Sequence, residues 1–299
     1  MNHFPPPRIA AIHDLSCFGR CALTVIIPTL SVMGYQTVPV PTALLSTHTG
    51  GFTNLHFHDM TPHMEKITDH LASLGVTFRA LYSGFLGSAE QIHTVSHILK
   101  AFGATPDESG NLPLILVDPV MGDDGELYST YTPELMRGMR TLCHLAHLLT
   151  PNLTEACFLT DTPYQSTATM SEEDAMAFAN TLMDRLEQAF ATPQAVITGI
   201  HLPDGALANL GKNKDGSRFT VRRPTQAHSY PGTGDIFASV LLGKLLQTNN
   251  FEASCAYAAD FIATLIRESA KISTPARDGV ALEPNLWRLC DQGSASFES

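Results

Sequence analysis

The sequence predicts an α/β protein in which helices cover both faces of a mostly parallel central sheet, a three-layer sandwich. Apolar runs of strand length alternate with longer segments of helical period along nearly the whole chain. The strand-length runs are almost continuously apolar, as in strands that are buried on both faces of a parallel sheet. No repeat or linker divides the 299 residues, so one domain is expected over 1–299, with its core at about 8–270.

The strands are expected where these apolar runs end at proline, glycine or small polar residues. The run LPLILVDP is strongly apolar and ends at Asp118 and Pro119. Near the end of the sheet, Lys212–Gly216 separates two extended segments and indicates a β-hairpin. In chain order the expected strands are 9–13, 37–41, 42–46, 80–85, 112–119 and 195–199, followed by the hairpin over 205–223.

The helices are expected where apolar residues recur with helical period and a glycine or a capping residue marks an end. Glycines at 34, 75 and 103 end the first three helices, and Ser88 opens the third. Ser171 opens the fifth helix, and the tail 291–299 is expected to fray. The expected helices are 21–34, 62–75, 88–103, 133–149 (running into a short strand), 171–190, 234–248 and 252–270.

The composition is that of an ordinary globular protein, with 44% hydrophobic and 16% charged residues, which excludes a disordered chain. There are 29 acidic and 18 basic residues, and no run is rich in Lys or Arg. Nucleic acid and anionic membranes are therefore not expected as partners. Residues 21–58 contain no Asp, Glu, Lys or Arg, but prolines and a glycine interrupt them too often for a membrane span. The six cysteines form no CxxC pair and no export signal is visible, so a cytoplasmic protein is expected.

A glycine turn precedes an apolar helix at residues 230–236, YPGTGDI. The free backbone N–H groups of Gly232, Thr233 and Gly234, together with the helix dipole, favour an anion such as a phosphate. Asp235 follows at once and has two interpretations. It caps the helix, or it accepts a proton from an alcohol that attacks a phosphoryl group held by the turn. A helix N-terminus lowers the pKa of a carboxylate, so Asp235 is expected to be a weak base.

A second polar segment, DPVMGDDG, follows the apolar strand that ends near residue 118. Asp118 is expected to point into the crevice beyond the carboxyl ends of the strands, where ligands bind in such sheets. Asp123 lies in a turn flanked by glycines. Carboxylates at such a rim suit Mg²⁺ together with phosphate, although a simple polar turn would use the same residues.

A third segment, LLTPNLTEACFL, places Thr150 at the end of a short strand. Asn152 and Glu155 follow three residues apart, on one face of a helical turn. An amide and a carboxylate together suit a phosphate and metal site. The same pair also fits an Asn-capped helix with Glu155 in a capping box, and both interpretations can hold together.

Small polar residues gather in the two segments HDLSCFGRCA and LLSTHTGGF, which are almost free of charge. Asp14, Ser16, Ser46, His48 and Thr49 would suit the recognition of a small polar aromatic ring or a sugar. Ser, Thr and Asp also favour turns for local reasons, so turn chemistry is the alternative.

Together these four stretches resemble the ribokinase superfamily over roughly residues 8–270. DPVMGD (118–123) with TPNLTEA (150–156) is similar to the vitamin-kinase branch, which phosphorylates pyridoxal-type and hydroxymethylpyrimidine substrates. SGFLGSAEQ (83–91) and STHTGG (46–51) are similar to the pyridoxal kinase family. That family often has Asn where Thr47 stands and Tyr where Phe85 stands, so the resemblance leaves the preferred vitamer open.

The resemblance implies a role for each residue at a matching position. Asp235 resembles the family's catalytic base, beside an anion hole formed by the glycine turn, and Glu155 with Asp118 matches the Mg²⁺ positions. The positions implied for ATP are Asp118, Asp123, Thr150, Asn152 and Thr198, and those for the substrate are Asp14, Ser16, His48, Thr49 and Phe85.

The implied activity is the ATP- and Mg²⁺-dependent phosphorylation of the hydroxymethyl group of a vitamin B6 vitamer, by a ribokinase-like homodimer. One alternative is a hydroxymethylpyrimidine kinase of thiamine synthesis. Another is a non-catalytic carrier of a vitamer or nucleotide, against which the intact GTGD segment and Glu155 argue.

Overall fold

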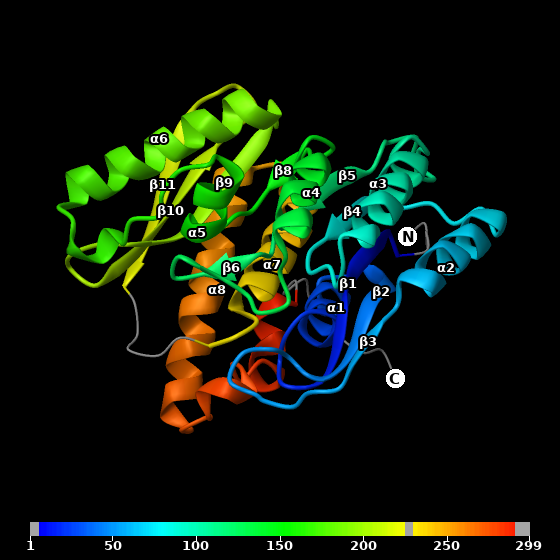
Figure 1. Ribbon diagram of the computed structural model, residues 1–299, viewed down its shortest axis with the longest axis horizontal. Coiled ribbons are helices and arrows are strands. Elements are labelled where there is room, and N and C mark those ends of the chain that lie inside the picture. Colours follow the sequence, from blue (N-terminus) through cyan, green and yellow to red (C-terminus); the bar gives the residue numbers. More distant parts are fainter. Residues whose placement is uncertain (1–5, 225–229, 291–299) are drawn as a thin grey trace, which may run out of the picture.

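The computed structural model describes residues 6–224 and 230–290 of the chain (Figure 1). Its centre is a nine-stranded sheet in the order β11-β10-β9-β8-β5-β4-β1-β2-β3. The pairs from β2 through β1, β4, β5 and β8 to β9 are parallel, whereas β3 and the hairpin β10–β11 are antiparallel. This mostly parallel sheet confirms the predicted α/β class. The tail 291–299, predicted to fray, lies outside the described residues.

The strands agree with the apolar runs of the sequence, with differences at their ends. The predicted pieces 37–41 and 42–46 form one strand, β2, and the first strand continues well beyond residue 13. The strands are β1 (Arg8–Phe18), β2 (Gln36–Thr47), β3 (Phe57–Asp59), β4 (Ala80–Ser83), β5 (Leu114–Val117), β6 (Gly122–Asp123), β7 (Glu126–Leu127), β8 (Leu148–Leu149), β9 (Gln194–His201), β10 (Ala206–Lys212) and β11 (Arg218–Pro224).

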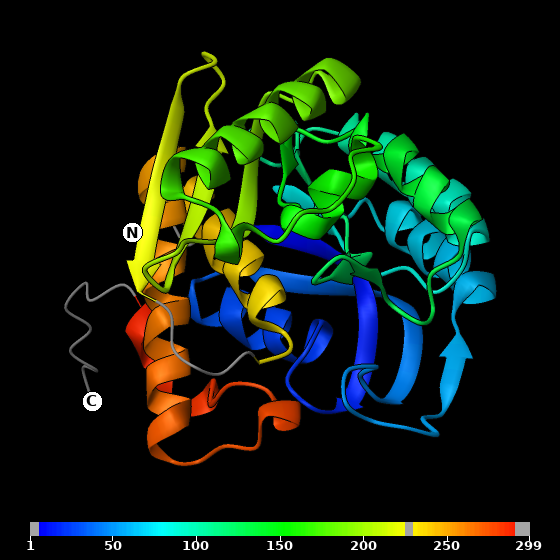
Figure 2. The same cartoon turned by 60° about the vertical axis from the view of Figure 1, so that its left-hand side comes forward.

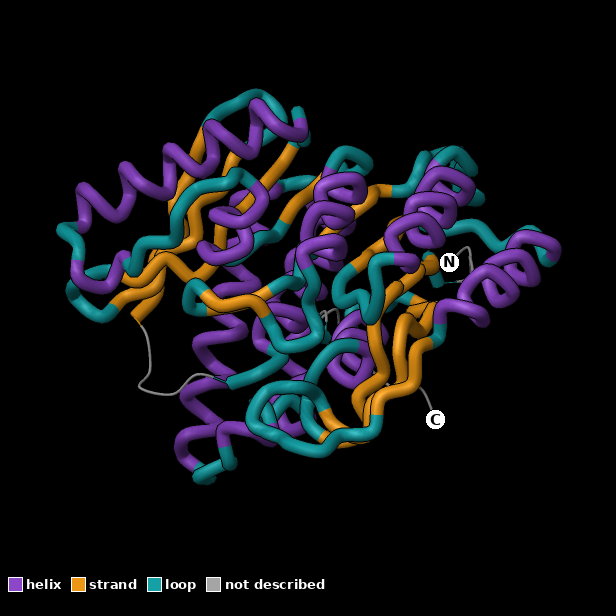
Figure 3. Tube along the Cα trace, in the orientation of Figure 1, coloured by secondary structure: helices purple, strands orange, loops and turns teal. Residues whose placement is uncertain are grey.

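The helices also follow the predicted segments, and Figure 3 shows them flanking the strands. Ser171 caps its helix as predicted, since its side chain accepts a hydrogen bond from the backbone of Asp174. Ser88 does not, because the third helix begins at Glu90 after Ala89 and has no side-chain cap. The α-helices are α1 (Leu23–Val32), α2 (Thr61–Ser73), α3 (Glu90–Gly103), α4 (Pro133–Cys143), α5 (Leu153–Leu159), α6 (Glu172–Phe190), α7 (Thr233–Thr248) and α8 (Phe251–Lys271), with 3₁₀ turns η1 (Thr167–Thr169), η2 (Ala276–Asp278) and η3 (Glu283–Leu289).

Two hydrophobic clusters lie on the two faces of the sheet. One packs α2 to α6 against the sheet, and the other packs α1, α7 and α8 against the opposite face (Figures 1 and 2). Alternate residues of one strand serve both clusters: Ala10 and Ile12 belong to the first, Ile9 and Ala11 to the second. A strand buried on both faces needs apolar side chains throughout, which explains the continuous apolar run in the sequence.

The first strand is irregular where it approaches the site. Its parallel register with β2 shifts between His13 and Leu15, and the strand then continues to Phe18. The sequence predicts a polar turn after residue 13, because Asp14 and Ser16 interrupt the apolar run. Backbone pairing with β2 keeps these residues extended instead, so their side chains lie on a strand rather than on a loop.

No helix within residues 6–224 and 230–290 is long and apolar enough to cross a membrane.

Candidate active site

The polar residues predicted for the site come from the carboxyl ends of neighbouring parallel strands. Asp14 lies in the second half of β1, Asp118 directly follows β5, Thr150 directly follows β8, and Thr198 lies on β9. Because the carboxyl ends of parallel strands meet at one edge of the sheet, these residues are brought to the same edge. The Asp235 charge raises the pKa of both Asp14 and Asp118, which places the start of α7 at this edge too.

The glycine turn, which is predicted to form an anion hole, begins with a residue in a backbone conformation that favours glycine. Gly232 is the N-cap of α7 with a φ of 78°, in the left-handed region that favours glycine. A Cβ atom at this position would lie 2.0 Å from the backbone oxygen of Arg20, so only glycine fits against the β1–α1 loop. Gly234 is exposed, and a Cβ atom there would meet open space. The start of α7 is therefore open to solvent at Gly234, and the anion hole stays a prediction.

Asp235 is the third residue of α7, yet it does not cap the helix. Its Oδ2 accepts hydrogen bonds from the backbone N–H of Ala22, at 2.9 Å, and from the thiol of Cys21, at 3.4 Å, both in the β1–α1 loop. Its Oδ1 lies 3.9 Å from Nδ1 of His13 and accepts no hydrogen bond from any described residue. The helix-cap interpretation of Asp235 is therefore wrong, and one carboxylate oxygen remains available.

Burial raises the pKa of the Asp235 carboxyl above its usual range, although the Ala22 N–H lowers it in part. The expectation of a weakly basic carboxylate at the helix N-terminus is therefore wrong in direction. Desolvation of the charged form outweighs the hydrogen bonds from the Ala22 N–H and the Cys21 thiol. A carboxylate with a raised pKa is a better proton acceptor than an exposed one.

Other buried carboxyl groups lie close to Asp235. Burial and then the Asp235 charge raise the pKa of Asp118 to about 8. Burial also raises the pKa of Glu155 well above its usual range, with the Asp118 charge adding to the effect. Asp123 is exposed as a residue, but partial burial of its carboxyl group raises the pKa there too. Carboxyl groups that raise one another's pKa are stabilised in their charged form by a cation placed between them.

Glu155 serves the protein at both of its oxygens. Oε2 accepts from the backbone N–H of Asn152 at 2.8 Å, which completes a capping box at the start of α5. Oε1 accepts from the N–H of Met121 at 3.0 Å. The capping-box interpretation is thus confirmed. A hydrogen-bonded carboxylate oxygen retains a further lone pair, so a role beside a metal ion stays a prediction.

The residues predicted for ATP lie along the ends of β5, β8 and β9. Thr150 is buried directly after β8, and the backbone of Thr198 pairs with the segment Pro151–Asn152. The Asn152 side chain is committed to the protein, because Oδ1 accepts from the Glu155 N–H and Nδ2 donates to the Gly122 carbonyl. Asn152 therefore fixes the β6–β7 turn that carries Asp123.

The residues predicted for the substrate differ in their burial and in their hydrogen bonds. Asp14 and Ser16 are buried side by side on β1, and the Ser16 hydroxyl donates to Oδ2 of Asp14 at 2.8 Å. Burial raises the pKa of Asp14 to about 7. Thr49 is half-buried in the loop after β2, and Phe85 lies mostly buried after β4. These four residues leave polar and aromatic groups near the mouth of the site.

His48 is already satisfied within the protein. Its Nδ1 accepts from the backbone N–H of Gly50 at 3.1 Å, so Nε2 carries the proton and donates to the Arg277 carbonyl at 2.7 Å. With both ring nitrogens bonded, His48 holds the loop after β2 against the C-terminal segment. The prediction that it binds the substrate stays untested, but in this arrangement it has no free nitrogen to offer.

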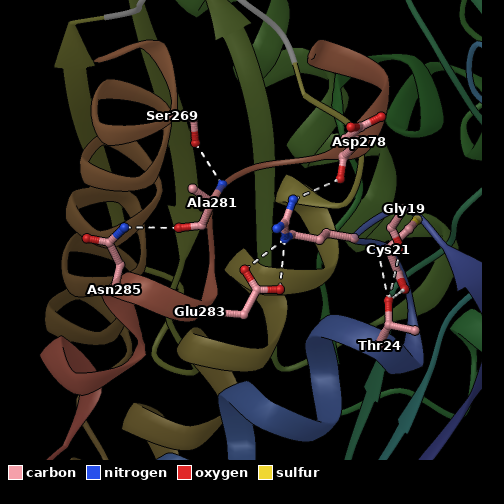
Figure 4. Close-up of polar contacts among 9 residues, drawn as sticks. Gly19, Cys21, Thr24, Ser269, Asp278, Ala281, Glu283 and Asn285 are labelled. Carbon is pink, nitrogen blue, oxygen red and sulfur yellow. Dashed lines mark hydrogen bonds and ion pairs between the residues drawn. The ribbon is translucent and has the colours of Figure 1, made fainter. Parts of the chain in front are cut away.

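The same C-terminal segment also holds the β1–α1 loop (Figure 4). The Arg20 backbone N–H donates to the Asp278 carbonyl at 3.2 Å, and the Arg20 Nε lies 2.9 Å from both carboxylate oxygens of Glu283. Arg20 in turn packs its carbonyl against the N-cap glycine of α7. The two loops at the mouth of the site are therefore anchored by residues more than 200 positions later in the chain.

Sequence reasoning missed His13, Cys21 and Arg20. His13 directly precedes Asp14 in the polar segment, and a histidine at the end of an apolar strand was an available signal. Cys21 and Arg20 carried no signal of their own, because their importance arises from contacts with Asp235 and Glu283, which lie far away in sequence.

The fold and the site together define a class of protein. A doubly covered parallel sheet, a glycine turn opening a helix, and a carboxylate with one free oxygen beside that turn are what phosphoryl transfer to an alcohol requires. The protein is thus a ribokinase-like enzyme.

Comparisons with known proteins agree with this class. Residues 9–278 match the family described as phosphomethylpyrimidine kinase. A pyridoxine/pyridoxal/pyridoxamine kinase from Bordetella avium is 28% identical over 93% of both chains. The crystal structure of pyridoxal kinase from Lactobacillus plantarum is 27% identical, with a TM-score of 0.82 over 95% of this chain and 96% of that one. A structure from Bacteroides thetaiotaomicron, crystallised with pyridoxal, is 35% identical over 95% of this chain and 96% of that one, with a TM-score of 0.81.

The chain belongs to this phosphomethylpyrimidine kinase family and, within it, to the pyridoxal kinases of the ribokinase superfamily. It is a phosphotransferase whose acceptor is an alcohol group.

Proposed function

We propose that this enzyme phosphorylates the hydroxymethyl group of a vitamin B6 vitamer (pyridoxal, pyridoxine or pyridoxamine) with ATP and Mg²⁺, in pyridoxal 5′-phosphate salvage. The observation that carries the proposal is the state of Asp235. It lies beside the glycine turn, its Oδ2 is anchored by the β1–α1 loop, and its Oδ1 is bonded to no described residue. The names of the related kinases supply the substrate class.

In this proposal the backbone N–H groups of Gly232, Thr233 and Gly234 hold the transferring phosphoryl group. Preorganised donors of this kind stabilise charge that develops during the reaction. Oδ1 of Asp235 accepts the proton of the substrate hydroxyl as the oxygen attacks phosphorus. The raised pKa of Asp235 supports this role, because general-base catalysis is most effective when the pKa lies nearer the working pH.

The nucleotide is assigned to the ends of β5, β8 and β9, near Asp118, Asp123, Thr150, Asn152 and Thr198. Asn152 contributes there by holding the β6–β7 turn. The vitamer ring is assigned to the side of Asp14, Ser16, Thr49 and Phe85, with His48 shaping the loop.

The donor set fits Mg²⁺. Within the described chain no three His, Cys, Asp or Glu side chains come close enough to chelate an ion by themselves. Mg²⁺ is commonly bound by one or two carboxylates together with substrate phosphates and water, which matches Asp118 and Glu155. Both carboxyl groups have raised pKa values and gain from a nearby cation. When bound there, Mg²⁺ would neutralise charge on the phosphates.

Release of ADP from the purified protein tests this function. The assay compares pyridoxal, pyridoxine, pyridoxamine and hydroxymethylpyrimidine, each with ATP and with or without Mg²⁺. We expect turnover with at least one vitamer, dependent on Mg²⁺. Absence of turnover with all three vitamers would overturn the proposal.

Hydroxymethylpyrimidine is the second candidate substrate, because the description of the matching family names the phosphorylated form of this pyrimidine. It shares with the vitamers a hydroxymethyl group on a small nitrogen-containing ring, so the same site can hold it. A higher kcat/KM for hydroxymethylpyrimidine than for every vitamer would assign the enzyme to thiamine synthesis instead.

The further expectations belong to the same proposal: one kinase domain over 1–299, a homodimer, and a cytoplasmic location. Size-exclusion chromatography with light scattering measures the oligomer. A mass of twice 32.4 kDa supports the dimer, and a mass of 32.4 kDa contradicts it.

A further inference from the structure

His13 is a buried histidine whose ring has no obvious structural purpose. It lies on β1 immediately before the register shift, and none of its surface is exposed. Neither ring nitrogen has a hydrogen-bond partner within residues 6–224 and 230–290. Buried polar groups in proteins are nearly always paired, and an unpaired one is unfavourable for stability. A group kept at such a disadvantage invites a functional explanation.

The surrounding residues fix the direction of the ring. Its edge packs against Tyr82 on β4, with ring centroids 4.3 Å apart. A Cβ atom at Gly84 would lie 2.1 Å from Cε1 and 2.4 Å from Nδ1, so the absence of a side chain at Gly84 makes room for the imidazole. The ring is packed between these neighbours, and its Nδ1 lies on the side that faces Asp235.

The two oxygens of Asp235 are held differently. Oδ2 is fixed by the Ala22 N–H and the Cys21 thiol, whereas Oδ1 faces His13 Nδ1 at 3.9 Å. This separation is about 0.7 Å longer than a long N–H···O hydrogen bond of ~3.2 Å. To close the gap, Oδ1 has to move toward the ring when the substrate binds.

The imidazole is neutral at the pH of the cell, because burial lowers the pKa of His13 to about 3. A neutral imidazole carries one proton, on Nδ1 or Nε2, and only the Nδ1–H form can donate to the facing carboxylate. Proximity to Oδ1 favours that form.

We propose that His13 is a positioning residue for the reaction: its Nδ1–H donates to Oδ1 of Asp235 when the alcohol binds, and so aims the remaining lone pair of Oδ1 at the substrate hydroxyl. The inference rests on the proposed role of Asp235. With donors on both oxygens the carboxylate can no longer rotate, and misplacement of a catalytic group by about 1 Å can lower a rate by ~10²-fold.

Three substitutions of His13 separate this role from simple packing. His13→Asn keeps an N–H donor close to the place of Nδ1, His13→Gln moves the donor towards the place of Nε2, and His13→Leu fills the space without a donor. We expect about 10- to 100-fold lower kcat for Leu and Gln, near-normal kcat for Asn, and little change in either KM. Because the wild-type ring is unpaired, His13→Leu should not lower the melting temperature.

Thr29→Val is the matched control. Thr29 is a fully buried residue of α1 whose hydroxyl also lacks a partner among the described residues, and its removal should leave kcat unchanged. Equal kcat for the Asn and Gln variants would overturn the inference. The inference would also be overturned if His13→Leu lost activity only in proportion to a loss of folded protein, and if His13→Asn stayed folded but had the same low kcat as His13→Leu.

A double-mutant cycle with Asp235→Asn tests whether His13 acts through Asp235. In that background His13→Leu should lower kcat by less than about two-fold, because the group to be positioned is gone. Independent, multiplying losses would overturn the inference. The proposed function fails separately, if the wild type turns over no vitamer or if Asp235→Asn alone is near normal.

Discussion

Helices α5 and α7 each carry a carboxylate at the third position of the first turn, where acidic residues commonly cap. Glu155 in α5 reaches back to the backbone N–H of its N-cap, Asn152, and forms a capping box. Asp235 in α7 has a glycine, Gly232, as its N-cap and turns away from the helix to the β1–α1 loop. Asp is one methylene shorter than Glu, and a left-handed glycine offers no side chain for a reciprocal bond. The same position thus gives a structural group in one helix and an available group in the other.

The comparison shows that hydrogen bonds within the protein reduce the number of acceptor sites that a carboxylate can offer to a ligand. Both carboxylates occupy the third position of their helix, and both lie near the carboxyl ends of the strands. What differs is the number of backbone donors that each already accepts, which is two for Glu155 and one for Asp235 among the described residues.

The largest expected effect is that of Asp235→Asn. Asn keeps the size and can still accept a hydrogen bond from the Ala22 N–H, but it cannot take up the substrate proton. General-base contributions are typically about 10²–10⁴-fold, or ~3–5 kcal/mol of barrier, and we expect a loss of kcat in that range. The melting temperature and the KM for ATP should change little. Near-normal turnover would place Asp235 with Glu155 as a structural carboxylate and remove the contrast.

Asp14 lies between the two cases, since it accepts one hydrogen bond, from Ser16, and is buried. Its pKa of about 7 in the folded protein exceeds the value of 3.8 expected of an unfolded chain. The folded state therefore binds the proton more tightly, and this contribution to stability is present below about pH 4 and is lost as the pH rises to about 7. Asp14→Asn has no such loss. Without ligands, we expect the free energy of unfolding of Asp14→Asn to gain up to about 4 kcal/mol over wild type between pH 4 and pH 8.

Chemical unfolding at several pH values measures this difference. Asp69→Asn, on an exposed position of α2, is the control for the substitution itself. A pH-independent difference for Asp14→Asn would show that Asp14 is ionised in the folded protein and satisfied by partners of its own.

Glu155→Gln sharpens the comparison from the other helix. The substitution keeps the shape but replaces one acceptor oxygen by an amide that cannot accept the N–H of Asn152 or Met121. We expect a loss of about 1 kcal/mol in the free energy of unfolding for one lost hydrogen bond. If Glu155 also orders Mg²⁺ through water, kcat falls about 10- to 100-fold and more Mg²⁺ is needed for half-maximal rate. An unchanged Mg²⁺ titration would leave Glu155 as a cap alone.

Much of this fold follows from local sequence. The apolar runs determine β1, β4, β5 and β9, and Lys212–Gly216 determines the hairpin turn, because each signal lies within one segment. The short strands β3, β6 and β7 carry no such signal, since two or three residues are too few to show a period. Glycines and a following carboxylate were enough to locate the start of α7.

The details that decide which side chains are available were not predictable from the sequence. Asp235 is fixed by Cys21 and Ala22, more than 200 residues earlier, and His48 by the carbonyl of Arg277. These contacts join segments that are far apart in the sequence, so no local sequence pattern predicts them. Likewise, the burial that raises rather than lowers the pKa of Asp235 depends on packing from several elements.

The smallest expected effect concerns two neighbours in the loop after β2. Both nitrogens of His48 are bonded to backbone, whereas Thr49 is half-buried and no bond within the described chain engages its hydroxyl. By the same reasoning as for the two helices, Thr49 is the residue that remains available to the vitamer ring.

Thr49→Val removes one hydrogen bond of about 0.5–1.5 kcal/mol and should raise the KM for the vitamer about 2- to 12-fold, with the KM for ATP nearly unchanged. Steady-state kinetics with each substrate varied in turn measures both constants. Thr105→Val, at an exposed position after α3 whose hydroxyl donates to the Ala101 carbonyl, is the matched control and should alter neither KM. Equal increases in the two KM values for Thr49→Val would show instead that Thr49 supports the loop, as His48 does.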